Sequence, residues 1–314
     1  MAFRDQLPQS SGRVFITDGG METTLIFGHG FDLPCFASFP LLREVDGRRA
    51  LRAYFQPYVE IAREHDVGLI LDTVTWRASV DWGAQLGFSP EDVDEVNRDA
   101  VLLMEEIRAK SEAAGIPILI NGCVGPRGDA YSPAELMTAA EAEQYHSRQI
   151  GVLSETAVDM IGGLTITYAE EAVGIARAAR TVAIPVVISF TVETDGRLPS
   201  GQSLRNAIEQ VDGETDGSVA YFMVNCAYPT HFADVLEDGA AWTSRIRGVR
   251  ANASSKSHAE LDDSVELDDG DPEMLAAEFQ ALQRVLPNMN VVGGCCGTDH
   301  RHIAAICRAR LATT

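Results

Sequence analysis

Short apolar runs alternate along this chain with longer stretches that have an amphipathic pattern. The runs are rich in β-branched residues and show little alternation with polar ones, which indicates strands buried on both faces, as in a parallel sheet. Each run leads into a polar or glycine-rich turn and then into apolar residues at helical spacing. There are eight such runs, at residues 14–20, 67–75, 116–125, 158–165, 184–192, 220–227, 246–253 and 290–297.

The stretches between the runs predict the helices. Residues 50–66 and 90–115 carry apolar positions three and four apart, and Pro57 disturbs the first of them only mildly if it lies near a helix start or kink. Eight strand–helix units in 314 residues favour a closed (β/α)8 barrel in a single domain, 1–314, with its core at about 12–310. A doubly wound open sheet stays the alternative, because periodicity alone does not show closure.

Composition narrows the class of partner. The formal net charge of −21 argues against nucleic acid and anionic membranes, and no apolar run approaches the length of a membrane span. The first ten residues lack a signal-peptide pattern, so we expect a cytoplasmic protein with reduced cysteines that acts on small molecules; a homo-oligomer stays open. The densest acidic stretch, residues 259–273, is expected to be a solvated loop before a helix.

Polar and sulfur-bearing residues gather where the apolar runs end. In a barrel of this kind the carboxyl ends of the strands share one mouth, where function collects. Five runs end in this way, which predicts one shared site. Its candidates are Asp18, Gly19, Gly20, Asp72, Thr73, Thr75, Asn121, Cys123, Asn225, Cys226, Cys295 and Cys296.

Three of the six cysteines form the most specific subset. Cys226 ends the sixth run, and the adjacent Cys295 and Cys296 end the eighth. These strands are next-but-one neighbours in a closed barrel, so three thiolates can hold a tetrahedral Zn²⁺ and leave its fourth position open, as in catalytic sites. Gly293 and Gly294 are expected to let the backbone turn so that both neighbouring sulfurs reach the metal. Spacing alone leaves three buried, hydrophobe-like cysteines as an equal alternative.

Three segments resemble the homocysteine S-methyltransferase family. They are "DGGMETTL" at 18–25, "VNCAYP" at 224–229 and "GGCCGTDHRHI" at 293–303, and the similarity extends from about residue 12 to 310. The resemblance implies a (β/α)8 (TIM) barrel that binds Zn²⁺ through Cys226, Cys295 and Cys296. It also implies that a thiol, homocysteine above all, takes a methyl group from a sulfonium or quaternary ammonium donor and that methionine forms.

The resemblance also assigns substrate contacts. Asp18 matches an aspartate that helps to bind the amino acid, and Asp72 and Thr73 match a threonine-rich second strand that contacts the acceptor. Gly19, Gly20 and Asn225 belong to the same matched segments. An acidic mouth with aromatic neighbours such as Trp76 would suit a cationic donor.

One position departs from the family pattern. The fourth strand of the family carries a glutamate that pairs with the homocysteine ammonium, whereas this chain has Leu164 there, followed by Thr165. Leucine cannot neutralise an ammonium, so either a nearby glutamate replaces it or the acceptor is bound differently or is another thiol. The candidate replacements are Glu170, Glu171 and Glu193. A barrel that binds zinc or thiols without catalysis is the remaining alternative.

Overall fold

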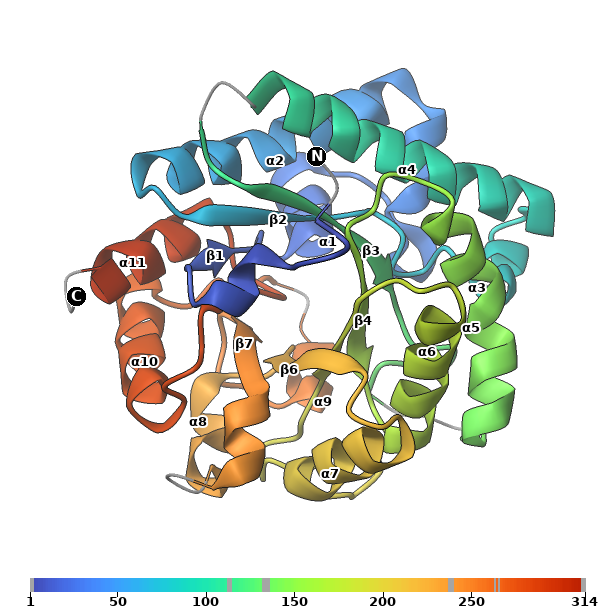
Figure 1. The fold of residues 1–314 in the computed structure, drawn as a ribbon. Helices are drawn as coiled ribbons and strands as arrows, with labels where there is room; N and C mark the ends of the chain where they lie inside the picture. Colours follow the sequence, from blue (N-terminus) through green and yellow to red (C-terminus); the bar gives the residue numbers. More distant parts are fainter. Residues whose placement is uncertain are drawn as a thin grey trace.

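Eight parallel strands close into a barrel in sequence order, as Figure 1 shows. The structure is a computed structural model that describes residues 3–111, 115–131, 136–236, 240–262, 264 and 266–311. Each predicted apolar run contains one strand, so the closed barrel is confirmed and the open sheet is excluded. The strands are β1 Phe15–Ile16, β2 Gly68–Asp72, β3 Ile118–Val124, β4 Met160–Ile166, β5 Val186–Phe190, β6 Val219–Asn225, β7 Ile246–Ala251 and β8 Val291–Gly294.

Helices form a ring outside the strands (Figure 1). Pro57 lies inside α2, so this proline is accommodated within a helix rather than at its start. Within the described residues no helix combines the length and the apolar character that a membrane span requires. The helices are α1 Met21–Thr23, α2 Val45–Glu64, α3 Val80–Gln85, α4 Pro90–Ser111, α5 Ala139–Ser154, α6 Ala169–Thr181, α7 Leu204–Glu214, α8 Pro229–Phe232, α9 His258–Asp262, α10 Pro272–Val285 and α11 His300–Leu311.

The strands bury both of their faces, which explains why their sequences lack polar alternation. One face packs against the helices in the larger apolar core. The other face fills the barrel with a smaller cluster, which includes Leu7, Phe15, Ile70, Leu119, Met160, Leu164, Val187, Tyr221, Met223 and Val291. The barrel interior is therefore packed with side chains, as is usual for this architecture.

The segment before β1 closes the amino-terminal end of the barrel. Leu7 joins the interior cluster, and the buried Gln9 amide donates a hydrogen bond to the Tyr221 hydroxyl at 3.2 Å. Near the chain start, the Phe3 amide donates to the buried Asp159 carboxylate at 2.7 Å. With this end closed, the opposite end, where the strands finish, is left to form a pocket.

Candidate functional site

A cavity of about 460 Å³ lies at the carboxyl ends of the strands. Its walls come from β4 itself and from the ends of β1, β2, β3, β6, β7 and β8 or the segments that follow them, so it draws on almost the whole circumference of the barrel. Every substrate-contact residue and cysteine expected from the resemblance lines this cavity: Asp18, Gly19, Gly20, Asp72, Thr73, Asn225, Cys226, Cys295 and Cys296. Most of the shared site predicted from the strand ends thus forms one pocket, whereas two of its candidates, Thr75 and Asn121, do not line it.

The sulfurs of Cys226, Cys295 and Cys296 gather at one side of this pocket. The three Sγ atoms lie within 4.8 Å of one another. Cys226 follows β6 in a left-handed backbone conformation with φ of 53°, which is unfavourable for a residue with a Cβ and is found mostly at functional sites. The Asn225 side-chain amide lies 3.9 Å from the Cys295 sulfur. The Tyr131 hydroxyl lies at the same distance from the Cys296 sulfur.

The sulfurs of Cys226 and Cys295 are close enough to form a disulfide, and the Cα atoms of the two residues lie 5.4 Å apart. The order of the strands brings them together, because β6 and β8 flank β7 and end at the same level.

The glycines before the cysteine pair have a different task from the one expected. Neither Gly293 nor Gly294 adopts a positive φ, so a sharp turn is not what they provide. A Cβ on Gly293 would collide with the Thr17 hydroxyl, and one on Gly294 with the Thr298 hydroxyl. These glycines therefore let β8 approach its neighbours closely, and the positive φ of the segment falls after the cysteines, at Gly297 (79°).

Gly19 and Gly20 allow a second close approach. A Cβ on Gly20 would lie 2.6 Å from the Cys295 carbonyl oxygen, and one on Gly19 would lie 2.7 Å from that of Thr298. The two glycines thus pack the segment after β1 directly against the segment that carries the adjacent cysteines. Gly19 and Gly20 therefore allow this close packing and also form part of the pocket wall.

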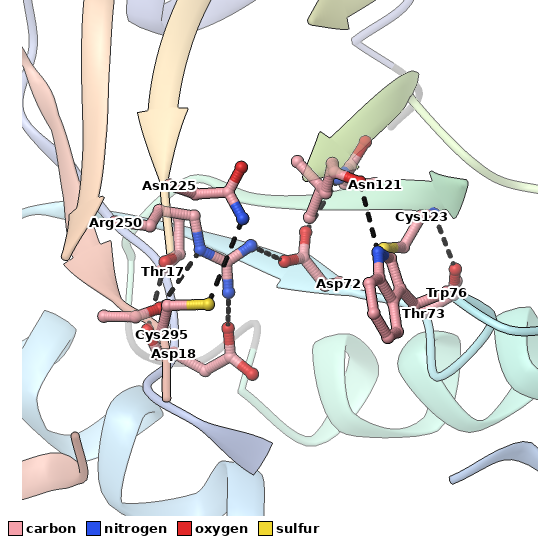
Figure 2. A network of polar contacts seen from close by, with 12 residues as sticks. Thr17, Asp18, Asp72, Thr73, Trp76, Asn121, Cys123, Asn225, Arg250 and Cys295 are labelled. Atoms are coloured by element: carbon pink, nitrogen blue, oxygen red, sulfur yellow. Dashed lines mark hydrogen bonds and ion pairs between the residues drawn. The ribbon is translucent and has the colours of Figure 1, made fainter. Parts of the chain in front are cut away.

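A buried cluster of three charged residues lies beside the sulfurs. Figure 2 shows the Arg250 guanidinium, from β7, between the carboxylates of Asp18 and Asp72. Arg250 Nη2 donates to Asp18 Oδ1 at 2.6 Å, Nη1 donates to Asp72 Oδ2, and Nε donates to the Gly294 carbonyl at 3.3 Å. All three side chains are less than a tenth exposed. We call this group the charge cluster.

Burial sets the protonation behaviour of the charge cluster. Desolvation raises the pKa of Asp18 to about 7, and the attraction of Arg250 offsets only part of this rise. For Arg250, desolvation acts to lower the pKa, but the two neighbouring carboxylates outweigh it and hold the pKa above its ordinary value. The guanidinium is therefore a permanent positive charge in this pocket.

Hydrogen bonds fix the other polar residues at the strand ends. Asn225 accepts from the Thr165 amide at 2.9 Å and donates to its hydroxyl at 2.8 Å. The Thr73 hydroxyl accepts from the Cys123 amide at 2.9 Å. Burial raises the pKa of the Cys123 thiol well above its ordinary value, so this cysteine stays neutral and does not extend the set of three.

None of the expected replacement glutamates lies opposite Leu164. Glu171 is fully buried and paired with His146 at 3.0 Å, and Glu170 accepts from Gln210 at 3.1 Å. Glu193 lies 3.3 Å from a ring nitrogen of His258. None of the three glutamates lines the pocket, whereas Leu164 does. A substitute for the missing carboxylate is therefore absent from these positions.

A second layer of contacts supports the sulfurs. The other ring nitrogen of His258 lies 2.6 Å from the Cys226 carbonyl oxygen. Tyr131 stacks on the His258 ring with centroids 4.0 Å apart. These contacts join the segments after β3, β5, β6 and β7. Sequence reasoning missed His258 and Tyr131, because neither residue ends an apolar run.

The acidic stretch, expected to be a solvated loop before a helix, is largely exposed where it is described and leads into α10, and it also borders the pocket. Leu261, Ser264, Glu266, Leu267 and Asp268 line the cavity, while Asp263 and Val265 lie outside the described residues. Arg250 was also missed, although it was present in the run at 246–253. That run holds two arginines, Arg247 and Arg250, and charge inside a strand expected to be buried on both faces was the signal that could have identified it.

A (β/α)8 barrel with three cysteine sulfurs and a buried charge cluster at its mouth defines a barrel enzyme with sulfur at the centre of its site. The family model described as homocysteine S-methyltransferase matches residues 15–310. The chain therefore belongs to the homocysteine S-methyltransferase family, and it is a methyltransferase.

Named relatives cover almost the whole chain. It is 25% identical to homocysteine S-methyltransferase 4 of Zea mays over 96% of this chain and 90% of that protein. It is 24% identical to a selenocysteine Se-methyltransferase of Brassica oleracea var. italica, with the same coverage of both proteins.

Solved structures share the fold. The homocysteine methyltransferase MmuM of Escherichia coli in its oxidized form superposes with a TM-score of 0.74 at 19% identity, covering 95% of this chain and 96% of that one. The metallated form of the same enzyme superposes with a TM-score of 0.73, covering 94% and 96%. At this identity the likeness concerns the fold.

Proposed function

We propose that this protein transfers a methyl group from a sulfonium or quaternary ammonium donor to the sulfur of a thiol, with Zn²⁺ held by Cys226, Cys295 and Cys296. The observation that carries the proposal is the gathering of three sulfurs in a pocket at the barrel mouth. Homocysteine is the first acceptor to consider, because it gives the family its name. The product would then be methionine.

The three cysteines fit a zinc ion. Thiolates around a tetrahedral zinc at about 2.3 Å lie roughly 3.8 Å apart, and the three sulfurs here already lie within 4.8 Å of one another. Binding requires the Cys226–Cys295 pair to be reduced, because only thiolates are ligands. When bound, zinc lowers the pKa of a coordinated thiol and so makes it a nucleophile at neutral pH.

The transfer itself needs few protein groups. The thiol would release its proton to water before the transfer, when it becomes a thiolate. In the transfer its sulfur forms the new bond to the methyl carbon, and the donor's carbon–sulfur or carbon–nitrogen bond breaks with the electron pair leaving on the donor. The donor loses its positive charge, and no base takes part in this step. This agrees with a pocket in which the ionisable groups near the sulfurs are engaged with one another.

The outer part of the pocket supports a cationic donor. The carboxylates of Glu22, Glu266 and Asp268 line it, and they attract positive charge. The Arg77 guanidinium covers one face of Trp76, at 4.1 Å from the ring centroid. Other aromatic surface at the mouth comes from Phe27, Phe36 and Tyr131.

The test combines metal content with turnover. The protein is reduced, loaded with zinc and assayed with homocysteine and S-methylmethionine, S-adenosylmethionine or glycine betaine. We expect about one zinc per chain and formation of methionine from at least one donor. A fully reduced protein that binds no zinc would contradict the metal site. A zinc-loaded protein that methylates no thiol from any of these donors would contradict the proposed reaction.

A further inference from the structure

We propose that Arg250 anchors a carboxylate of the acceptor, so that the pocket selects short thiols by their acid group and does not require an amino group. The inference rests on the proposed thiol methylation and defines its substrate class. Among the pocket-lining residues that the structure describes, two are cations, Arg77 and Arg250. Arg77 lies between the rings of Trp76 and Trp82, whereas Arg250 lies beside the sulfurs.

Arg250 keeps donors that the protein does not use. Arginine has five N–H groups, and three of those of Arg250 go to Asp18, Asp72 and the Gly294 carbonyl. Two N–H groups are thus left without a partner among the described residues. They belong to a side chain that is 8% exposed and lines the cavity. Buried donors of this kind gain most from a charged acceptor such as a ligand carboxylate.

Each oxygen of the two carboxylates in the charge cluster already accepts one hydrogen bond. Asp18 accepts from Arg250 on one oxygen and from the Tyr54 hydroxyl, at 3.1 Å, on the other. Asp72 accepts from Arg250 on one oxygen and from the Asn121 amide, at 2.7 Å, on the other. An incoming ammonium would have to share oxygens that already hold a donor, whereas an incoming carboxylate meets unused N–H groups.

The charge cluster is also at the right distance along the sheet. The Cys226 amide donates to the Arg250 carbonyl at 3.1 Å, and the Cys295 amide donates to the next carbonyl, of Ala251, at 2.7 Å. Arg250 therefore lies between the two strands that carry the sulfurs. A ligand with its sulfur at the cysteines and its carboxylate at Arg250 needs only a short carbon chain.

The wall on the β4 side suits that carbon chain. Leu164 is 7% exposed and lines the cavity. Its carbonyl is taken by the Trp76 indole N–H at 3.1 Å. The following Thr165 is occupied by Asn225. An ammonium placed against this wall would lose water without gaining a counter-charge, and methylene groups would not.

A matched pair of analogues separates the two groups of homocysteine. 4-Mercaptobutanoate lacks only the amino group, and 3-mercaptopropylamine lacks only the carboxylate. Their methylated forms, 4-(methylthio)butanoate and 3-(methylthio)propylamine, can be compared with methionine by calorimetry on the reduced, zinc-loaded protein without any methyl donor. We expect the acid to bind within about tenfold of methionine and the amine about 100-fold more weakly or worse, since charged hydrogen bonds are at stake.

The opposite order would overturn the inference, as would an acid that binds more than about 100-fold more weakly than methionine. Arg250→Lys keeps the charge but loses the planar fork, so it is expected to weaken the acid about tenfold and to leave the amine unchanged. If Arg77→Lys weakens binding of the acid about tenfold and Arg250→Lys does not, then Arg77 binds the carboxylate and the inference is wrong. Thermal unfolding verifies that each variant is folded, and the comparison of analogues on the unaltered protein needs no variant.

Turnover separates this inference from the proposed function. Methylation of homocysteine and 4-mercaptobutanoate, with 3-mercaptopropylamine about 100-fold poorer in kcat/KM, supports both. If no thiol is methylated but the analogues bind in the expected order, the proposed reaction is contradicted and carboxylate binding by Arg250 is supported. If thiols are methylated and the amine is preferred to the acid, the proposed reaction is supported and carboxylate binding by Arg250 is contradicted.

Discussion

The sulfur cluster and the charge cluster occupy the same pocket but differ in how they are built. The sulfurs of Cys226, Cys295 and Cys296 belong to segments that resemble the family, and their contacts to a side-chain amide and a hydroxyl are long, at 3.9 Å. The charge cluster of Asp18, Asp72 and Arg250 is tied together by direct ion pairs and further hydrogen bonds. The first arrangement suits a site that receives a metal, and the second suits a fixed surface that recognises a substrate. Under the proposed function, the reaction would depend on β6 and β8, and the choice of acceptor would depend mainly on Arg250 in β7.

The largest effect is expected from the sulfur cluster. Cys226→Ser removes one of three proposed ligands, so zinc content should fall below about half an equivalent and kcat/KM by at least about 10³-fold, because metal activation accounts for several kcal/mol. Metal analysis and a methylation assay on the reduced protein measure both. Cys35→Ser, at an exposed cysteine outside the cluster, is the control and should change neither. Full activity in Cys226→Ser would remove this residue from the reaction.

The next effect concerns the stability that the charge cluster provides. Arg250→Met leaves two buried carboxylates without their common partner, which should lower the free energy of unfolding by about 3–5 kcal/mol in urea titrations. Adding Asp18→Asn and Asp72→Asn to that variant should restore much of the loss. Arg148→Met breaks an exposed ion pair with Asp94 and should shift the urea midpoint little. Equal shifts of the urea midpoint in Arg250→Met and Arg148→Met would mean that the charge cluster stabilises the protein no more than an exposed ion pair does.

The pH dependence of stability provides a smaller test of the charge cluster. Burial raises the pKa of Asp18 from its ordinary value of 3.8 to about 7 in the folded protein. The folded state therefore keeps a proton that the unfolded state has lost. Its stabilising contribution is complete below about pH 4 and is lost as the pH rises through about 7.

Relative to Asp18→Asn, the wild type should lose stability between these pH values, with a slope of at most about 1.4 kcal/mol per pH unit. Urea titrations at several pH values measure the slope. Arg250, Asp72, Tyr54 and Glu22 surround this carboxyl and act on its pKa, so each must stay unchanged in the comparison. Parallel pH profiles for the two proteins would show that Asp18 titrates as an ordinary carboxyl.

The smallest effect is expected from Tyr54→Phe. This change removes one hydrogen bond to Asp18 and should lower the free energy of unfolding by about 1 kcal/mol. Because that bond lowers the pKa of Asp18, its loss should also move the pH-dependent fall in stability to higher pH. The same urea titrations detect both changes. A shift to lower pH would mean that the tyrosine does not stabilise the carboxylate form.

The fold could be predicted because its signal is local. Continuous apolar runs followed by helical spacing occur eight times, and each run contains one strand of the barrel. The strand ends also predicted the pocket, since parallel strands present their carboxyl ends at one mouth. The positions of residues such as Asp72 and Cys295 at the pocket could therefore be predicted from the sequence.

The parts that were missed depend on contacts across the barrel. Arg250 was part of a predicted strand, but its partners Asp18 and Asp72 lie on strands far away in the sequence, and only closure brings them together. The acidic loop after β7 is exposed as its sequence indicates, but the sequence does not show that it also lines the pocket. For Gly294, the chain gave the residue type but not the Thr298 hydroxyl that excludes a side chain.

The position of β7 between the two sulfur-bearing strands limits how this site can change. The backbone of Arg250 spaces the strands of Cys226 and Cys295, while its side chain belongs to the charge cluster. A shift or insertion in the backbone of β7 would therefore disturb the separation of the sulfurs and the charge cluster together. A side-chain substitution such as Arg250→Lys leaves these backbone hydrogen bonds in place and alters the charge cluster alone.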